Sequence, residues 1–180
     1  MTQTPLNLIT GEAERGAVHE AGHIVVGLSL GVTIEKVSRV EGAELPSVLR
    51  DIGFESSVAT DFSNSIHQIE PRRQFLIAVG GMAAETHRFG FYNKLGCAHD
   101  IEALKPNIFT EAELKGLIEI AQLMLLPNLA IFNYVKEELY HWLNVPGTAA
   151  VLGDEFNQRF LEKGTKVDIT EHLDRVLPPE

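Results

Sequence analysis

Residues 15–30, RGAVHEAGHIVVGLSL, contain the pattern H-E-x-x-H, formed by His19, Glu20 and His23. The apolar residues around the pattern favour a buried α-helix. Residues four positions apart lie one above the other on a helix, so both imidazoles can reach one metal ion from the same face. Imidazole is a preferred ligand of Zn²⁺, and a catalytic zinc site has three protein ligands and an open position for water. The segment therefore predicts a zinc site in which Glu20 is the general base.

The alternative is a pair of ordinary core histidines with hydrogen-bond partners in the protein interior. An apolar helix would then have to satisfy two buried imidazoles and a carboxylate, and unpaired polar groups are costly in such a setting. Gly22 lies between the two histidines. Because glycine costs a helix roughly 1 kcal/mol relative to alanine, its presence favours a close packing partner at this position. The specificity of the motif favours the metal site.

Further motifs follow in an order that resembles one protein family. The run AVHEAGHIVVG (17–27) resembles the zinc-binding helix of the FtsH-type ATP-dependent metalloproteases. EKVS (35–38) and IGF (52–54) are similar to two strands of that family. GGMAAE (80–85) is similar to its G-G-R-A-A-E helix, and LGCAHDIE (95–102) to its segment G-A-x-N-D-[IL]-E. The resemblance lies in the succession of these motifs, and it covers the chain from the first to the last of them.

The resemblance implies that Asp100 is the third zinc ligand. His99 stands where the family commonly has a polar amide residue, and its imidazole competes with Asp100 for the same role, since three-histidine zinc sites exist. The resemblance favours Asp100 and leaves His99 near the rim of the site. Cys97 is a softer donor than either, but it matches a variable position of the family motif, so we expect it outside the ligand set.

Glu85 is the predicted partner of a zinc-bound imidazole. An acid inside an apolar helix is costly unless it is paired, and a hydrogen bond from a ligating histidine would satisfy it. A solvent-facing position or direct ligation stays open for Glu85 at this point. The glycine pair at 80–81 on the same predicted helix permits a close approach to the zinc helix.

The predicted fold is mainly α-helical, in the α+β sense, with a small β-sheet beside the H-E-x-x-H helix. Alternating residues predict strands at 32–40 and 52–60, which could pair with each other. An exposed strand edge beside the metal could bind extended substrate, and an ordinary sheet edge explains the pattern equally well. A loop at 61–71 and a helix at 72–89 follow. The turn RVEG (39–42) departs from the family, which usually has P-R-G there.

The second half of the chain predicts helices that pack around the zinc helix. Thr110 and Glu113 form a predicted capping box ahead of a helix at 114–126. Pro127 interrupts the pattern, and helices at 128–143 and 148–163 come next. We expect the remaining C-terminal residues to be loosely held.

The 180 residues are enough for one domain, divided here into a lead-in (1–12), a metal-site core (13–109), a helical bundle (110–163) and a tail (164–180). The net charge of -10 argues against a nucleic-acid partner. A single cysteine excludes an intrachain disulfide and favours the reducing cytoplasm. We expect no secretory signal and no membrane span, because the apolar stretches are too short and too polar.

Together these features predict a zinc metalloendopeptidase that cleaves peptides or unfolded proteins. The chain has no G-x-x-x-x-G-K-[ST] phosphate loop, so the ATPase module of FtsH-type proteases has no counterpart in it. A separate ATPase or an FtsH-type complex is therefore a predicted partner. The sequence predicts no particular oligomeric state.

Two other functions compete with a peptidase. The chain could be a non-catalytic FtsH-like metal-binding protein that regulates or joins an ATPase or protease complex. Glu20 argues against this alternative, because a structural zinc site usually fills all four positions with protein ligands and has no use for a base. Hydrolysis of a non-peptide amide is compatible with the motif as well.

Overall fold

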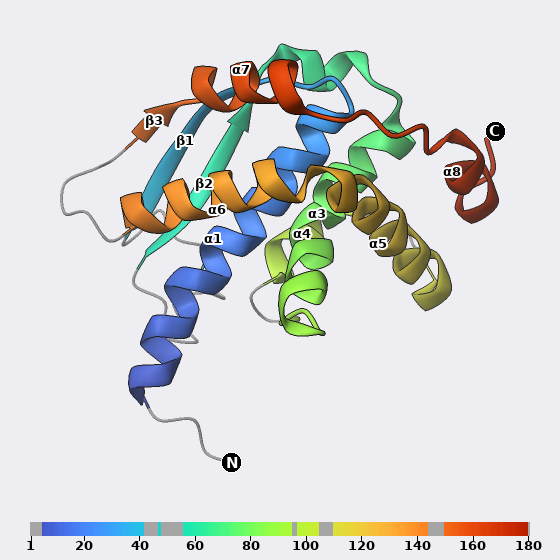
Figure 1. Cartoon of the computed structure of the whole chain (residues 1–180). Helices are drawn as coiled ribbons and strands as arrows, with labels where there is room; N and C mark the ends of the chain where they lie inside the picture. The colour runs from blue at the N-terminus through green and yellow to red at the C-terminus, as the bar shows by residue number, and fades with distance from the viewer. Residues whose placement is uncertain are drawn as a thin grey trace.

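The computed structural model describes residues 5–41, 47, 56–94, 97–104, 110–143 and 150–179. These residues form a mainly helical fold with a small antiparallel sheet. Helix α1 (Pro5–Ser29) runs through the middle of the molecule (Figure 1). It begins well before residue 15, so it takes in most of the predicted lead-in.

Within the described part of the chain, the sheet has three strands in the order β2-β1-β3. Strand β1 (Ile34–Glu41) pairs with β2 (Ser56–Phe62) on one side and with β3 (Ala150–Leu152) on the other, and both pairings are antiparallel. The predicted pairing of the first two strands is therefore confirmed. The second strand ends at Phe62, slightly later than predicted, and residues 52–55 of the prediction lie outside the described residues.

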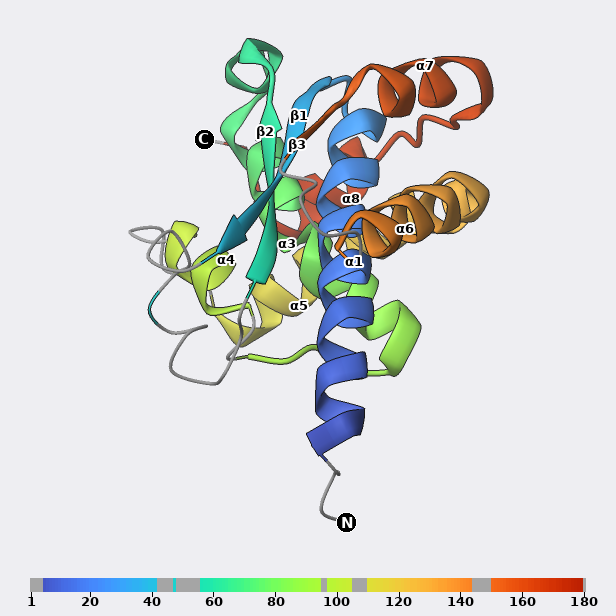
Figure 2. The same cartoon turned by 90° about the vertical axis from the view of Figure 1, so that its left-hand side faces the viewer.

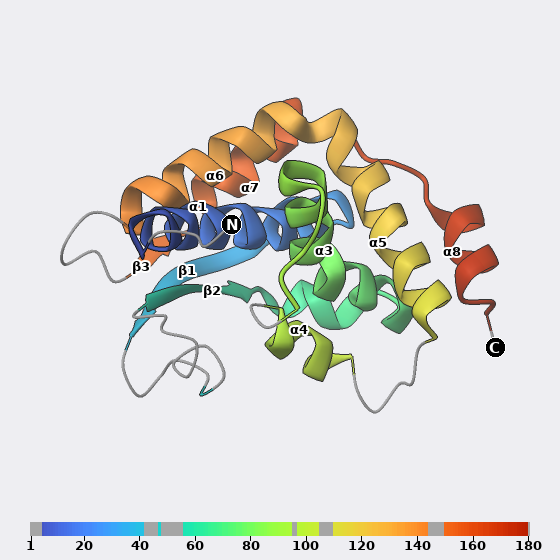
Figure 3. The same cartoon turned by 90° about the horizontal axis from the view of Figure 1, so that it is seen from below.

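Helix α1 lies between the sheet and helix α6 (Leu129–Leu143), as Figures 2 and 3 show. A helix that contacts neighbours on several sides must be apolar around most of its circumference. The sequence of α1 has this property, since Val18, Ile24 and Val25 are fully buried. This central position accounts for the absence of a polar face around the H-E-x-x-H pattern.

Helix α3 (Pro71–Phe89) crosses α1 at very short range. A Cβ atom added to Gly22 would lie 2.2 Å from the carbonyl oxygen of Gly80. Only hydrogen atoms fit between the two backbones at this point. The helix predicted at 72–89 and its close approach through the glycine pair are thus confirmed. A short 3₁₀ helix, η2 (Asn64–Gln68), lies within the loop predicted before α3.

Helix α5 (Glu111–Leu125) begins at the predicted capping box. The Thr110 hydroxyl accepts a hydrogen bond from the Glu113 amide, and the Glu113 carboxylate accepts one from the Thr110 amide. The 3₁₀ turn η3 (Leu126–Asn128) then links α5 to α6 at Pro127, where the interruption was predicted.

The segment Glu111–Trp142 is the one candidate membrane span among the residues that the structure describes. It qualifies by length and composition alone, and 44% of its most apolar window is buried inside the protein. Leu117, Met124 and Phe132 of this segment belong to the hydrophobic core. A core helix passes the same test of length and composition, so the segment is weak evidence for a membrane, and the absence of a span stays a prediction.

The C-terminal region differs from the prediction in two ways. The helix predicted at 148–163 is wrong at its start, because residues 150–152 form β3 and α7 begins only afterwards (Asp154–Lys163). A short apolar run such as AVL does not reveal its secondary structure, and pairing with β1 determines it here. The tail is not loosely held, since helix α8 (Thr170–Val176) buries Leu173.

Candidate metal centre

The three predicted ligands meet at one point between α1 and helix α4 (Ala98–Ala103). Asp100 Oδ2 lies 2.6 Å from His19 Nε2 and 3.2 Å from His23 Nε2. The two Nε2 atoms are 3.0 Å apart. Both imidazoles are buried, and Asp100 is only partly exposed. The structure therefore brings together two side chains from one helix and a third from a segment almost 80 positions away.

The second nitrogen of each imidazole faces a group that accepts hydrogen bonds. His23 Nδ1 lies 2.6 Å from the carbonyl oxygen of Ile77, and His19 Nδ1 lies 2.8 Å from Glu85 Oε2. Carbonyl and carboxylate oxygens are acceptors, so each neutral ring carries its hydrogen on Nδ1 and a lone pair on Nε2. Two nitrogen lone pairs and a carboxylate oxygen thus point at one another.

This donor set fits a divalent cation. For a tetrahedral ion with bonds of about 2.0–2.1 Å, neighbouring ligand atoms are about 3.3 Å apart. The three distances in this protein are 2.6, 3.0 and 3.2 Å. Nitrogen and carboxylate donors of this kind are typical of zinc and similar divalent ions. His19, His23 and Asp100 could therefore hold one such ion.

The pKa shifts of the three side chains indicate that positive charge is stabilised at the point where they meet. Burial lowers the pKa of His19, but its hydrogen bond to Asp100 and its other partners raise that pKa well above the ordinary value. Burial also lowers the pKa of His23, and the charge of Asp100 raises it above normal. Burial raises the pKa of Asp100, yet the two imidazoles hold it well below its usual range. Protons and a metal cation would therefore compete for this cluster.

Glu85 reaches the site from α3, as predicted, and it is 1% exposed. Its Oε2 accepts from His19 Nδ1 and from the Cys97 thiol at 2.9 Å, and its Oε1 accepts from Arg15 at 3.0 Å. Burial raises the pKa of Glu85, but these partners, His19 foremost, lower it below normal. The predicted imidazole partner is present, so Glu85 is neither solvent-facing nor beside the Nε2 atoms.

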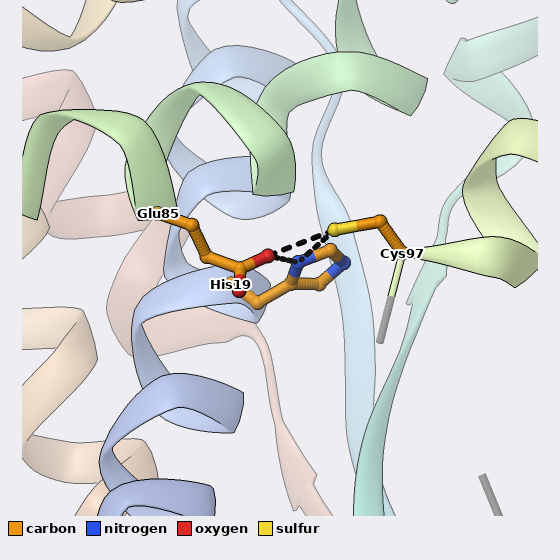
Figure 4. A group of neighbouring side chains, drawn as sticks. All are labelled: His19, Glu85 and Cys97. Atoms are coloured by element: carbon orange, nitrogen blue, oxygen red, sulfur yellow. Dashed lines mark hydrogen bonds and ion pairs between the residues drawn. The ribbon is translucent and has the colours of Figure 1, made fainter. Parts of the chain in front are cut away.

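Arg15 and Cys97 are site residues that the sequence did not identify. Arg15 stands one helical turn before His19, a spacing at which side chains meet, so its place could have been inferred. Cys97 lies just before α4, and its Sγ is 3.7 Å from His19 Nδ1 (Figure 4), whereas Asp100 contacts the other ring nitrogen, Nε2. Burial raises the pKa of this thiol to about 11.

Glu20 follows His19 directly on α1 and is partly exposed. Its Oε2 accepts a hydrogen bond of 2.7 Å from the hydroxyl of Thr60 on β2, a partner that the sequence did not reveal. The charge of Glu20 contributes to the raised pKa of His23, behind the larger effects of burial and Asp100. The side chain of His99 lies outside the described residues, so its position at the rim stays a prediction.

Gly81 makes room for His19. A Cβ atom at this position would lie 2.4 Å from Cε1 and 2.5 Å from Nε2 of the imidazole. Any side chain here would displace the ring from the point where it meets Asp100. The close packing of α3 on α1 therefore shapes the site directly.

No model of a known protein family matches this sequence, and a search of curated proteins finds no match. The resemblance to FtsH-type proteases therefore depends on the motifs and on their order.

Proposed function

We propose that this protein is a metal-dependent endopeptidase in which His19, His23 and Asp100 hold Zn²⁺ and Glu20 is the general base. The observation that carries the proposal is the convergence of two imidazole Nε2 atoms and one Asp100 oxygen within 2.6–3.2 Å of one another. When bound, zinc lowers the pKa of a coordinated water and polarises the carbonyl that the water attacks.

The chain's own residues have separate tasks in this mechanism. Glu85 and the Ile77 carbonyl hold the two rings with their Nε2 lone pairs toward Asp100, which keeps them ready as ligands. Glu20 takes a proton from the attacking water and passes it to the leaving amine. Thr60 holds the Glu20 carboxylate by its hydroxyl, so the base keeps one orientation while its partly exposed side chain stays within reach of solvent.

Peptides or unfolded chains are the proposed substrates. Strand β2 lies at one edge of the sheet that the described residues form, and Thr60 connects this strand to Glu20. An extended peptide can add to a strand edge by main-chain hydrogen bonds, whatever its side chains. This mode of binding fits a substrate without stable tertiary structure. A separate ATPase or FtsH-type complex would extend the range to folded proteins, and a cytoplasmic location would suit such a partner.

Glu20→Gln tests the proposal, because it removes the base and preserves the size of the side chain. We expect wild-type protein to contain about one zinc ion per chain and to hydrolyse casein, and a chelator to abolish the hydrolysis. We expect Glu20→Gln to contain the same zinc and to lose hydrolysis by about 100-fold or more. Glu119→Gln, an exposed position on α5, is the matched control and should behave as wild type.

Each result has a distinct meaning. Hydrolysis by Glu20→Gln at the wild-type rate would refute the assigned base. Wild-type protein that binds no divalent ion would refute the metal centre. Zinc binding without any hydrolysis by the wild type would support the non-catalytic regulator instead.

A further inference from the structure

A second donor group lies behind His19. Asp100 contacts Nε2 of the ring, and Nδ1 faces Glu85 Oε2 at 2.8 Å and Cys97 Sγ at 3.7 Å (Figure 4). Cys97 Sγ and Glu85 Oε2 are 2.9 Å apart. The three side chains come from α1, from α3 and from the residue before α4, and all are buried. Nitrogen, oxygen and sulfur ligand atoms thus meet at a single interior point.

The chemistry of these atoms suits a thiophilic cation. Their mutual distances are 2.8, 2.9 and 3.7 Å, so one ion could contact all three. A tetrahedral ion with zinc-like bonds would separate sulfur and nitrogen ligands by about 3.6 Å. The measured separation of Cys97 Sγ from His19 Nδ1 is 3.7 Å. Thiolates bind soft metals in preference to hard ones. The metal preference of this group should therefore differ from that of His19 Nε2, His23 and Asp100, which offer only nitrogen and oxygen.

We propose that His19 Nδ1, Glu85 and Cys97 form a second site for a thiophilic divalent cation such as Cd²⁺, and that this site competes with the first one through the shared imidazole. Binding at the second site does not depend on the proposed peptidase function. The second part, in which zinc at the first site loses its His19 ligand, does depend on the proposed function.

The two sites compete because both use the imidazole of His19. When zinc occupies Nε2, His19 is neutral and carries its one N–H on Nδ1, toward Glu85. A cation on Nδ1 displaces this hydrogen, and Nε2 takes a proton and donates it to Asp100, which lies 2.6 Å away. The Cys97 S–H bond breaks as the sulfur–metal bond forms. One proton per ion is released to solvent, and Nε2 no longer offers a lone pair beside His23.

Cys97 gives this proposal a specific signal, because it is the only cysteine of the chain. A thiolate bound to Cd²⁺ produces a charge-transfer absorption in the ultraviolet, so any such band reports on this residue. The full chain, freed of metal, is titrated with Cd²⁺ alone. We expect a band that saturates at one ion per chain, and we expect protein already loaded with zinc to require more Cd²⁺ for the same band.

Three variants separate the two sites. Asp100→Asn damages the first site and should keep the band. Cys97→Ser can still donate a hydrogen bond to Glu85 but lacks the thiolate, so it should lose the band, and Cys97→Ala should lose it too. Circular dichroism checks that each variant is folded. These readouts are independent of hydrolysis, so they can succeed when the peptidase proposal fails.

Two results would overturn the inference. Absence of the band in folded wild-type protein would show that the second group binds no thiophilic ion and serves only to orient His19. A band that is unaffected by prior loading with zinc would refute the competition. The same titration of Asp100→Asn removes any contribution of the first site to that comparison.

Discussion

The crossing of α1 over α3 and the junction of α5 with α6 hold helices together in different ways. At the crossing, glycines bring backbone against backbone, and the site residues lie in the space around them. At the junction, large apolar side chains fill the core and a buried amide, Asn128, joins the turn to a distant segment. The first contact tolerates almost no added volume. The second depends on satisfied hydrogen bonds, and it can be weakened without touching the site.

Gly22→Ala tests the crossing of α1 and α3, and it is expected to have the largest effect on stability and zinc content. The new Cβ atom would lie 2.2 Å from the backbone oxygen of Gly80, and a backbone atom cannot turn aside as a flexible side chain can. Overpacking of this kind costs about 3 kcal/mol in free energy of unfolding and should separate the helices that form the metal centre. Thermal unfolding and zinc content by elemental analysis measure both effects.

Gly16→Ala is the matched control on the same helix. A Cβ atom at Gly16 would have no neighbour within 4 Å. Because alanine is the better helix former, this variant should be as stable as the wild type or up to about 1 kcal/mol more stable, with unchanged zinc. Equal stability of Gly22→Ala and Gly16→Ala would contradict the role assigned to the crossing.

Asn128→Ala tests the other region and should have a smaller effect. The Asn128 amide donates to the carbonyls of Met124 and Thr165, and its oxygen accepts from the Thr165 amide at 2.7 Å. Removing a buried side chain with these bonds leaves main-chain groups unsatisfied, which costs about 2 kcal/mol. Chemical denaturation measures the loss. Asn133→Ala, at an exposed position on α6, is the control and should change little.

The zinc content of Asn128→Ala separates the two regions. We expect it to equal that of the wild type in the folded protein, since Asn128 contacts neither α1 nor α3 in its hydrogen bonds. Loss of zinc from a folded Asn128→Ala would show that the junction also determines the geometry of the centre.

The sequence predicts the crossing far better than it predicts the distant contacts. The H-E-x-x-H pattern and the apolar residues around it place His19 and His23 on one face of a buried helix, as found. Asp100 could be placed only through a family resemblance, because no local rule joins it to residues some 80 positions away. Strand β3 was missed because three apolar residues have no periodicity of their own.

The contacts that complete the site could not be predicted from the sequence, because they too join residues far apart in the chain. Thr60 meets Glu20 across 40 positions, and Cys97 meets His19 across 78. Neither pair has a spacing that a helix or strand would impose. Both depend on how the sheet and α4 pack against α1, which is a property of the fold. The hydrogen bond between Glu85 and His19 could be expected because an acid in an apolar helix needs a partner, a rule that applies wherever the partner comes from.

The dependence of zinc affinity on pH is the expected effect that is most specific to the centre. The pKa values of His19 and His23 are raised, mainly by Asp100 against the opposing effect of burial, from an ordinary value of 6.5. A proton on Nε2 must leave before a metal can bind there, so each protonated histidine weakens affinity by about tenfold per pH unit below its pKa. The weakening should therefore begin above pH 6.5, earlier than for an ordinary histidine.

In metal-free protein the free energy of unfolding should fall as the pH rises, whereas zinc affinity should increase. A raised pKa in the folded state stabilises the fold below the unfolded value, and this contribution is lost as the pH rises through the folded value. The increase in melting temperature caused by zinc should thus grow from about pH 6 to about pH 8. Melting curves with zinc and with chelator across that range measure it. If the increase in melting temperature caused by zinc is constant with pH, protons and zinc do not share the Nε2 positions. Asn128→Ala should lower the melting temperature equally with zinc and with chelator, so the difference between the two should be that of the wild type.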